Sequence, residues 1–137
     1  MITVKGIDFE GIRYGAATYE AHSGLKDAVN AARDWNDDGR DAVIGKAVTI
    51  TGDGEAGYGS DGDQLLGKIH QYEFDEKVTV QDAGYTELPG VSGNLPTAGD
   101  FVVVNGSGAV VASTGAVGPA KAVSVDTANY KVMVLIS

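Results

Sequence analysis

The chain has no cysteine in its 137 residues. This absence excludes disulfides, thiol catalysis and thiolate metal sites together, and it leaves the cellular compartment open. The sequence also lacks an apolar run of 18 residues and a basic-then-apolar segment at its start. From these absences we expect a soluble protein that is not secreted.

Basic residues are scarce, because 10 Lys and Arg stand against 19 Asp and Glu and give a net charge of −9. A strongly acidic surface repels phosphate backbones and anionic lipids, which argues against a nucleic-acid or membrane partner. It is compatible with a soluble protein that binds one specific partner.

Apolar residues make up 43% of the chain, and 20 glycines are scattered among Asp, Ser and Asn without a period. This composition predicts a folded chain with many tight turns, as opposed to a disordered or collagen-like one. The length suits a single domain with a sizeable core.

One helix is predicted, over Ser23–Trp35, and we place it at the start of a domain that covers residues 23–137. Ser23 is the expected N-cap, and Asp27 lies near the positive end of the helix dipole. Apolar residues recur every three or four positions, at Leu25, Ala28, Val29, Ala32 and Trp35. On this pattern Trp35 is expected to anchor the core.

From residue 41 onward, short β-branched runs alternate with turns of Gly, Asn and Asp. These runs predict strands at 42–51, 64–72, 77–81, 101–104, 109–112, 120–125 and 131–136. Pro89, Pro96 and several glycines argue against a central strand within residues 82–98. The predicted fold is mainly β, a small β-sandwich or β-barrel with one short helix and an N-terminal arm.

Residues 1–22 are predicted to form that arm or an edge segment, because glycines at 6, 11 and 15 interrupt any strand that begins at residue 2. The segment either packs irregularly on the domain or docks on a neighbouring protein. In the docking interpretation, deletion of residues 1–22 leaves the β domain folded. The anchors would then be the apolar and aromatic residues Ile2, Val4, Phe9, Tyr14 and Tyr19.

Residues 34–39, Asp-Trp-Asn-Asp-Asp-Gly, match the opening of an EF-hand-type calcium loop. The match then ends, because position twelve of the loop would be Gly45, which has no carboxylate. We interpret the segment as a polar turn that ends the helix. A weak calcium site is the alternative, with Asp34, Asn36 and Asp38 as its ligands.

The sequence offers no convincing combination of catalytic residues. His22 and His70 have no base or ligand set near them in the sequence, and no Gly-x-Ser-x-Gly elbow is present. A Gly-x-Gly-x-x-Gly pattern at 52–57 lies in an acidic loop that is not expected to open a helix. We therefore expect no enzymatic activity and no cofactor.

The order of turns and strands from residue 41 to 137 resembles the small capsid decoration, or cement, proteins of tailed bacteriophages. It consists of a short β pair, a Gly-Asp before a hydrophobic strand, a Gly-x-Gly hairpin and a terminal strand. The segments that carry it are residues 62–69, 77–84, 96–100, 105–110, 125–126 and 131–136.

The resemblance implies a β-rich protein of the virion that is made in the host cytoplasm and binds the outside of the expanded capsid. The partner would be the major capsid protein, bound at capsomer junctions, with the decoration protein often a trimer. Two alternatives stay open. One is a small enzyme that uses His22 or His70 with carboxylates, and the other is a calcium-dependent carbohydrate-binding or adhesion module.

Overall fold

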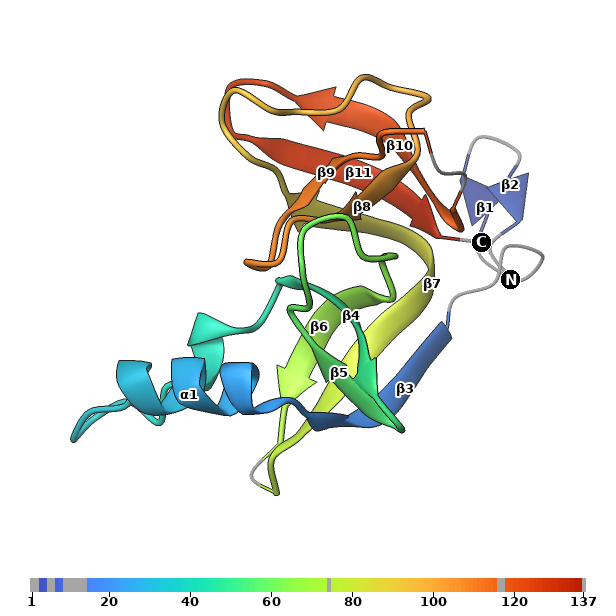
Figure 1. Cartoon of the computed structure of the whole chain (residues 1–137). Helices are drawn as coiled ribbons and strands as arrows, with labels where there is room; N and C mark the ends of the chain where they lie inside the picture. Colours follow the sequence, from blue (N-terminus) through green and yellow to red (C-terminus); the bar gives the residue numbers. More distant parts are fainter. Residues whose placement is uncertain (1–2, 5–6, 9–14, 74, 116–117, 137) are drawn as a thin grey trace.

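The computed structural model describes residues 3–4, 7–8, 15–73, 75–115 and 118–136. Two β lobes share one long strand, β7 (Lys77–Pro89), which runs from the lower lobe of Figure 1 into the upper one. The lower lobe is a five-stranded barrel with the helix at its side, so the prediction of a mainly β fold with a barrel and one helix is confirmed.

The barrel closes through β7, because the first half of this strand pairs with a different strand on each edge. Val78–Gln81 pair antiparallel with β3 (Gly15–Ala21) on one edge and with β6 (Gly67–Tyr72) on the other. β3 also pairs parallel with β5 (Glu55–Gly57), and β4 (Ala47–Gly52) completes the ring between β5 and β6.

The second lobe is built on the other half of β7. β11 (Lys131–Ile136) pairs antiparallel with β7 from Gly84 to Pro89, and β10 (Ala120–Asp126) pairs with the outer edge of β11. A hairpin of β8 (Val102–Val104) and β9 (Val110–Ala112) joins this sheet through single bridges to β10 and to the end of β7. A separate small hairpin pairs β1 (Thr3–Val4) with β2 (Ile7–Asp8).

Each lobe has its own apolar core. In the barrel, Val48, Ile69, Val78 and Val80 are completely buried together with residues from the helix. The second core gathers Leu88 of β7 with valines of β8, β9 and β11, with alanines of β10, and with two residues from the barrel side, Ala47 and Leu65. The alternation of buried and exposed residues in β11 follows from its position, with one face on this core.

The helix α1 (Ser23–Ala32) is shorter than predicted. It begins at the expected residue, but the N-cap is His22, whose Nδ1 accepts a hydrogen bond from the Gly24 backbone N–H at 3.0 Å. Leu25 and Val29 bury the inner face of the helix against the barrel. The chain leaves the helix at Arg33, which has extended backbone angles, so the prediction that the helix reaches Trp35 is wrong.

Two strand predictions are also corrected. β7 continues through Pro89, where the sequence predicts a link, because Pro89 is its last residue and needs no interior ladder bond. β5 forms inside the acidic loop at residues 52–57. Residues 15–21 of the predicted arm or edge segment form β3, which lies between β5 and β7.

Truncation at the N-terminus tests this assignment. Deleting residues 1–21 removes β3 and opens the barrel between β5 and β7, so we expect loss of the cooperative thermal transition. Deleting residues 1–14 keeps β3 and is expected to leave that transition in place. Circular dichroism melts of both variants measure the difference, and a 1–21 deletion that melts like the full chain would contradict the barrel register.

Candidate functional site: the Trp35 turn

The most exposed large apolar side chain in the described chain is Trp35, at 94% of its full exposure. Trp35 lies in the four-residue segment 34–37, here called the Trp35 turn, between the end of α1 and the short 3-10 helix η1 (Arg40–Ala42). The next most exposed large apolar side chain is Ile50, at 51%. The prediction that Trp35 anchors the core is therefore wrong.

The Trp35 turn is held in one conformation by hydrogen bonds on both sides of the indole. The backbone N–H of Asp34 donates to the carbonyl oxygen of Asp37 at 2.9 Å. The Asp34 Oδ1 accepts from the Asn36 N–H at 3.0 Å, and the Asp37 Oδ1 accepts from the Gly39 N–H at 2.8 Å. Such Asx bonds satisfy the backbone locally and favour this turn conformation.

Gly39 allows the chain to fold back directly onto the helix end. Its φ is +82°, in the left-handed region, and its Cα is buried. A Cβ there would collide with the carbonyl oxygen of Val29 and would lie 2.9 Å from the backbone nitrogen of Arg33. Only glycine fits this approach, so the sequence Asp-Asp-Gly fixes where the turn sits on α1.

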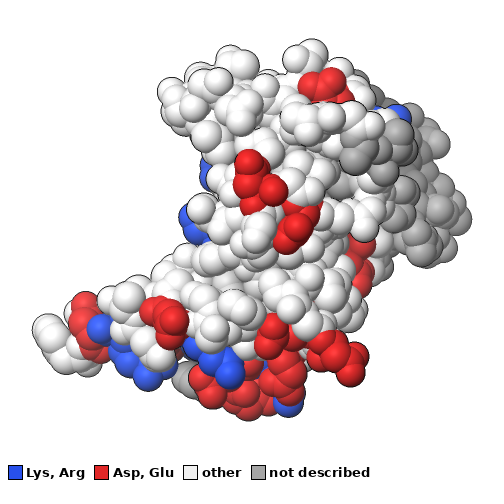
Figure 2. Space-filling model, viewed as in Figure 1, with Lys and Arg blue, Asp and Glu red and all other residues white. Residues whose placement is uncertain are grey.

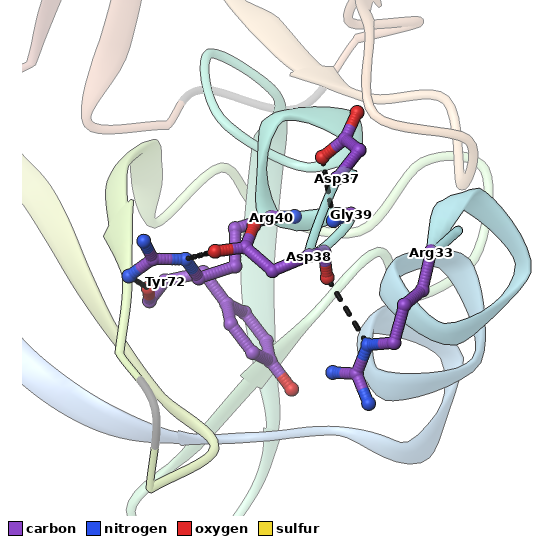
Figure 3. Close-up of polar contacts among 6 residues, drawn as sticks. All are labelled: Arg33, Asp37, Asp38, Gly39, Arg40 and Tyr72. Carbon is purple, nitrogen blue, oxygen red and sulfur yellow. Dashed lines mark hydrogen bonds and ion pairs between the residues drawn. The ribbon is translucent and has the colours of Figure 1, made fainter. Parts of the chain in front are cut away.

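Two arginines brace the segment that follows the turn (Figure 3). The Arg33 Nε donates to the carbonyl oxygen of Asp38 at 3.2 Å, and the Arg40 Nε forms an ion pair with the Asp38 Oδ2 at 2.9 Å. Arg40 also donates to the carbonyl oxygen of Tyr72 in β6 at 3.4 Å. The turn is thereby connected to the barrel wall as well as to the helix.

A pocket of about 400 Å³ adjoins the turn and is bordered by both flanking residues, Arg33 and Asp38. The Tyr72 side chain is almost completely buried beside it. Burial raises the pKa of the Tyr72 phenol above its ordinary 10.0, and the Glu76 carboxylate raises this pKa further, while Arg33 opposes the increase. The other lining residues are Asn30, Arg40, Glu73 and Glu76.

Negative charge is concentrated on the lobe that carries the turn. Residues 15–84 contain fourteen Asp and Glu against six Lys and Arg, a net charge of −8, whereas residues 85–137 contain three against two. Figure 2 shows acidic side chains gathered along the lower edge of the barrel lobe and few on the upper lobe. The barrel lobe therefore favours a partner with a basic binding surface.

The predicted calcium ligands Asp34, Asn36 and Asp38 all lie in this region, and carboxylate oxygens of Asp34 and Asp38 accept hydrogen bonds from the protein. Asp34 accepts from the backbone, and both carboxylate oxygens of Asp38 are bound by Arg40. Within the described ranges, no group of three or more His, Asp and Glu side chains is placed to hold a metal ion. The calcium site stays a prediction.

The predicted arm residues are not brought into this site. Ile2, Phe9 and Tyr14 lie outside the described residues, and Val4 lies in β1. Tyr19 is a barrel residue of β3, and its hydroxyl donates to the Asp82 Oδ2 at 3.2 Å. Burial raises the pKa of the Tyr19 phenol, and the Asp82 carboxylate raises it further. Docking by this segment stays a prediction.

The two histidines have separate positions. His22 caps α1 through its Nδ1, and His70 is exposed on β6. Among the parts of the chain that the structure describes, no helix is long and apolar enough to cross a membrane. No family model matches the chain, and no match is found among the curated proteins.

Sequence reasoning missed Trp35 as a surface residue because its spacing continues the apolar pattern of the helix. The signal that could have identified it is the run of Asp, Asn and Gly that surrounds it, since those residue types favour turns over a fourth helical turn. The bond from the Arg40 side chain to the Tyr72 carbonyl oxygen, which connects this region to β6, has no comparable signal because the two residues are 32 positions apart.

Asp38 makes the stability of this region depend on pH. The backbone N–H of Arg40, and then the Arg40 charge, hold the pKa of Asp38 below its ordinary 3.8. The ionised form is therefore favoured in the folded state, and its stabilisation is complete above pH 3.8 and disappears as the pH falls through the lowered pKa. Asp38→Asn should lower the melting temperature at about pH 6, and this difference from the wild type should shrink as the pH falls through the lowered pKa.

Melting curves of the two proteins across that range measure the effect. Asp53→Asn is the matched control, because the Asp53 carboxylate lies in the β4–β5 turn and makes no hydrogen bond or ion pair to the described residues. The proposed role of the Asp38 carboxylate would be contradicted if the melting temperatures of Asp38→Asn and wild type differed by the same amount from acid to neutral pH.

Proposed function

We propose that this chain is a capsid decoration protein, which binds the outer surface of an expanded tailed-phage head at capsomer junctions and stabilises it. The observation that carries the proposal is the exposed Trp35 in a turn that hydrogen bonds of Asp34 and Asp37 hold. Trp is enriched among the residues that dominate binding energy at protein interfaces, so a fixed, solvated indole is typical of a binding protein.

The placement of the resembling segments supports the same proposal. Residues 77–84 form the barrel half of β7, residues 105–108 form the turn between β8 and β9, and residues 131–136 are β11. Gly99 and Asp100 lie directly before β8, where the Asp100 Oδ2 accepts from the Thr97 N–H at 2.8 Å. The resemblance therefore concerns the elements that build both lobes.

Decoration would act by mass action, without chemistry. A ligand that binds only the assembled, expanded shell stabilises it by RT ln(1 + [L]/Kd), about 2.7 kcal/mol for each site at a ligand concentration of 100 Kd. The major capsid protein is the proposed partner, and a homotrimer on the capsid would multiply the bridges between subunits. The acidic barrel lobe would keep the unbound protein soluble until heads expand.

Co-sedimentation with heads of the phage that encodes the chain tests the function. Purified protein should sediment with expanded, undecorated heads at a saturable, fixed ratio to the major capsid protein, and it should raise the temperature at which those heads rupture. Unexpanded proheads are the matched control and should bind much less. Absence of saturable binding to expanded heads would refute the proposal.

A calcium-dependent carbohydrate-binding or adhesion module is the second candidate. It is favoured by the position of Trp35 between carboxylates, because an exposed aromatic ring beside oxygen ligands also suits a sugar. This candidate predicts a higher melting temperature with calcium than with a chelator, through stabilisation by the bound ion. An identical melting temperature in both conditions would remove it.

A further inference from the structure

Trp35 contrasts with every other large apolar side chain of the described chain. At 94% exposure its indole makes almost no contact with the protein, whereas the other exposed members of this class range from 39% to 51%. Trp side chains are on average highly buried, and a buried one removes about 150–250 Å² from water. The full area of this indole is available to a partner.

The backbone of the Trp35 turn is already ordered in the free protein, so binding a partner requires little further loss of conformational entropy there. The Asp34–Asp37 bridge, the two Asx bonds and the close packing of Gly39 on α1 hold the turn in place before any partner arrives. Binding through a preorganised loop loses less conformational entropy than binding through a mobile one. A turn that served only to end the helix would not need an indole at its tip.

The charges around the indole define the partner's chemistry. Asp34 and Asp37 lie on either side of Trp35 in the sequence. The adjoining pocket is bordered by three carboxylates, of Asp38, Glu73 and Glu76, and by two guanidinium groups, of Arg33 and Arg40, so negative charge is in excess there. A complementary surface therefore carries Lys or Arg around an apolar pocket. Phosphate backbones would be repelled by the net charge of −8 on this lobe.

We propose that the Trp35 turn is an anchor that inserts the indole into an apolar pocket with a basic rim on a protein partner. The inference rests on the proposed function, and it then places this pocket on the outer surface of the major capsid protein. The carboxylates of Asp34 and Asp37 meet the basic rim, while the indole supplies most of the binding energy. The barrel lobe thus faces the shell.

Four variants separate the indole from the charges and from the fold. Trp35→Ala removes the anchor, and Trp35→Phe keeps an aromatic ring. Asp34→Asn with Asp37→Asn removes two charges but keeps the Oδ1 acceptors that hold the turn. Ile50→Thr is the matched control, because Ile50 is an exposed β-branched residue of β4, away from the turn.

Binding of each variant to expanded, undecorated heads is measured by co-sedimentation at two salt concentrations. Trp35→Ala should weaken Kd at least about 30-fold, as expected of an interface hot spot, and Trp35→Phe should recover part of the loss. The double Asn variant should bind more weakly at low salt and should lose much of the salt dependence. Ile50→Thr should bind as the wild type does.

Unchanged melting temperatures would show that these losses are not losses of folding, as expected for a side chain that contacts so little of the protein. If wild type binds heads and Trp35→Ala binds equally well, the anchor is refuted and the decoration function stands. If the wild type does not bind heads, both the proposed anchor role of Trp35 and the proposed decoration function are refuted. Binding of wild type to glycans in place of heads, lost in Trp35→Ala, would overturn the assignment of a protein partner.

Discussion

The pairing of β7 with three different strands is the constraint on which both lobes depend. Its first half has β3 on one edge and β6 on the other, and its second half has β11. At the change of partners, the buried Gln81 donates from Nε2 to the carbonyl oxygens of Ala83 and Tyr85, at 3.3 and 2.9 Å. Gly84 adopts a φ of +92° there. The side-chain amide supplies backbone bonds that a strand loses when it leaves one sheet for another.

The Trp35 turn takes its position from this same barrel. Leu25 and Val29 fix α1 on the core that β7 helps to build, and Gly39 fixes the turn on the last residues of α1. Arg40 then connects the turn to the backbone of Tyr72, whose strand pairs with β7. A continuous set of packed and hydrogen-bonded contacts thus runs from the barrel to the backbone beside Trp35.

The parts of the fold that the sequence predicted correctly are those that local signals determine. β8 to β11 are short β-branched runs between Gly, Asn and Asp turns, and the first residue of α1 follows from its apolar spacing. β3 and β5 were missed because their residues are mostly small, and their strand state depends on partners that are distant in the chain. The end of α1 was misplaced because Trp35 continued a periodicity that the following Asp and Gly residues interrupt.

The spacing of apolar residues alone could not predict the exposure of Trp35, because burial depends on tertiary packing. Periodicity indicates which residues share a face, but α1 covers only the barrel, and the fourth turn of the predicted helix would have had no core beneath it. The acidic residues next to Trp35 keep such an exposed indole compatible with solubility, since like charges on this lobe oppose self-association. The same charges would become attractive toward a basic surface. One arrangement of residues thus opposes indiscriminate self-association and, in the proposed function, would favour a basic surface on the capsid.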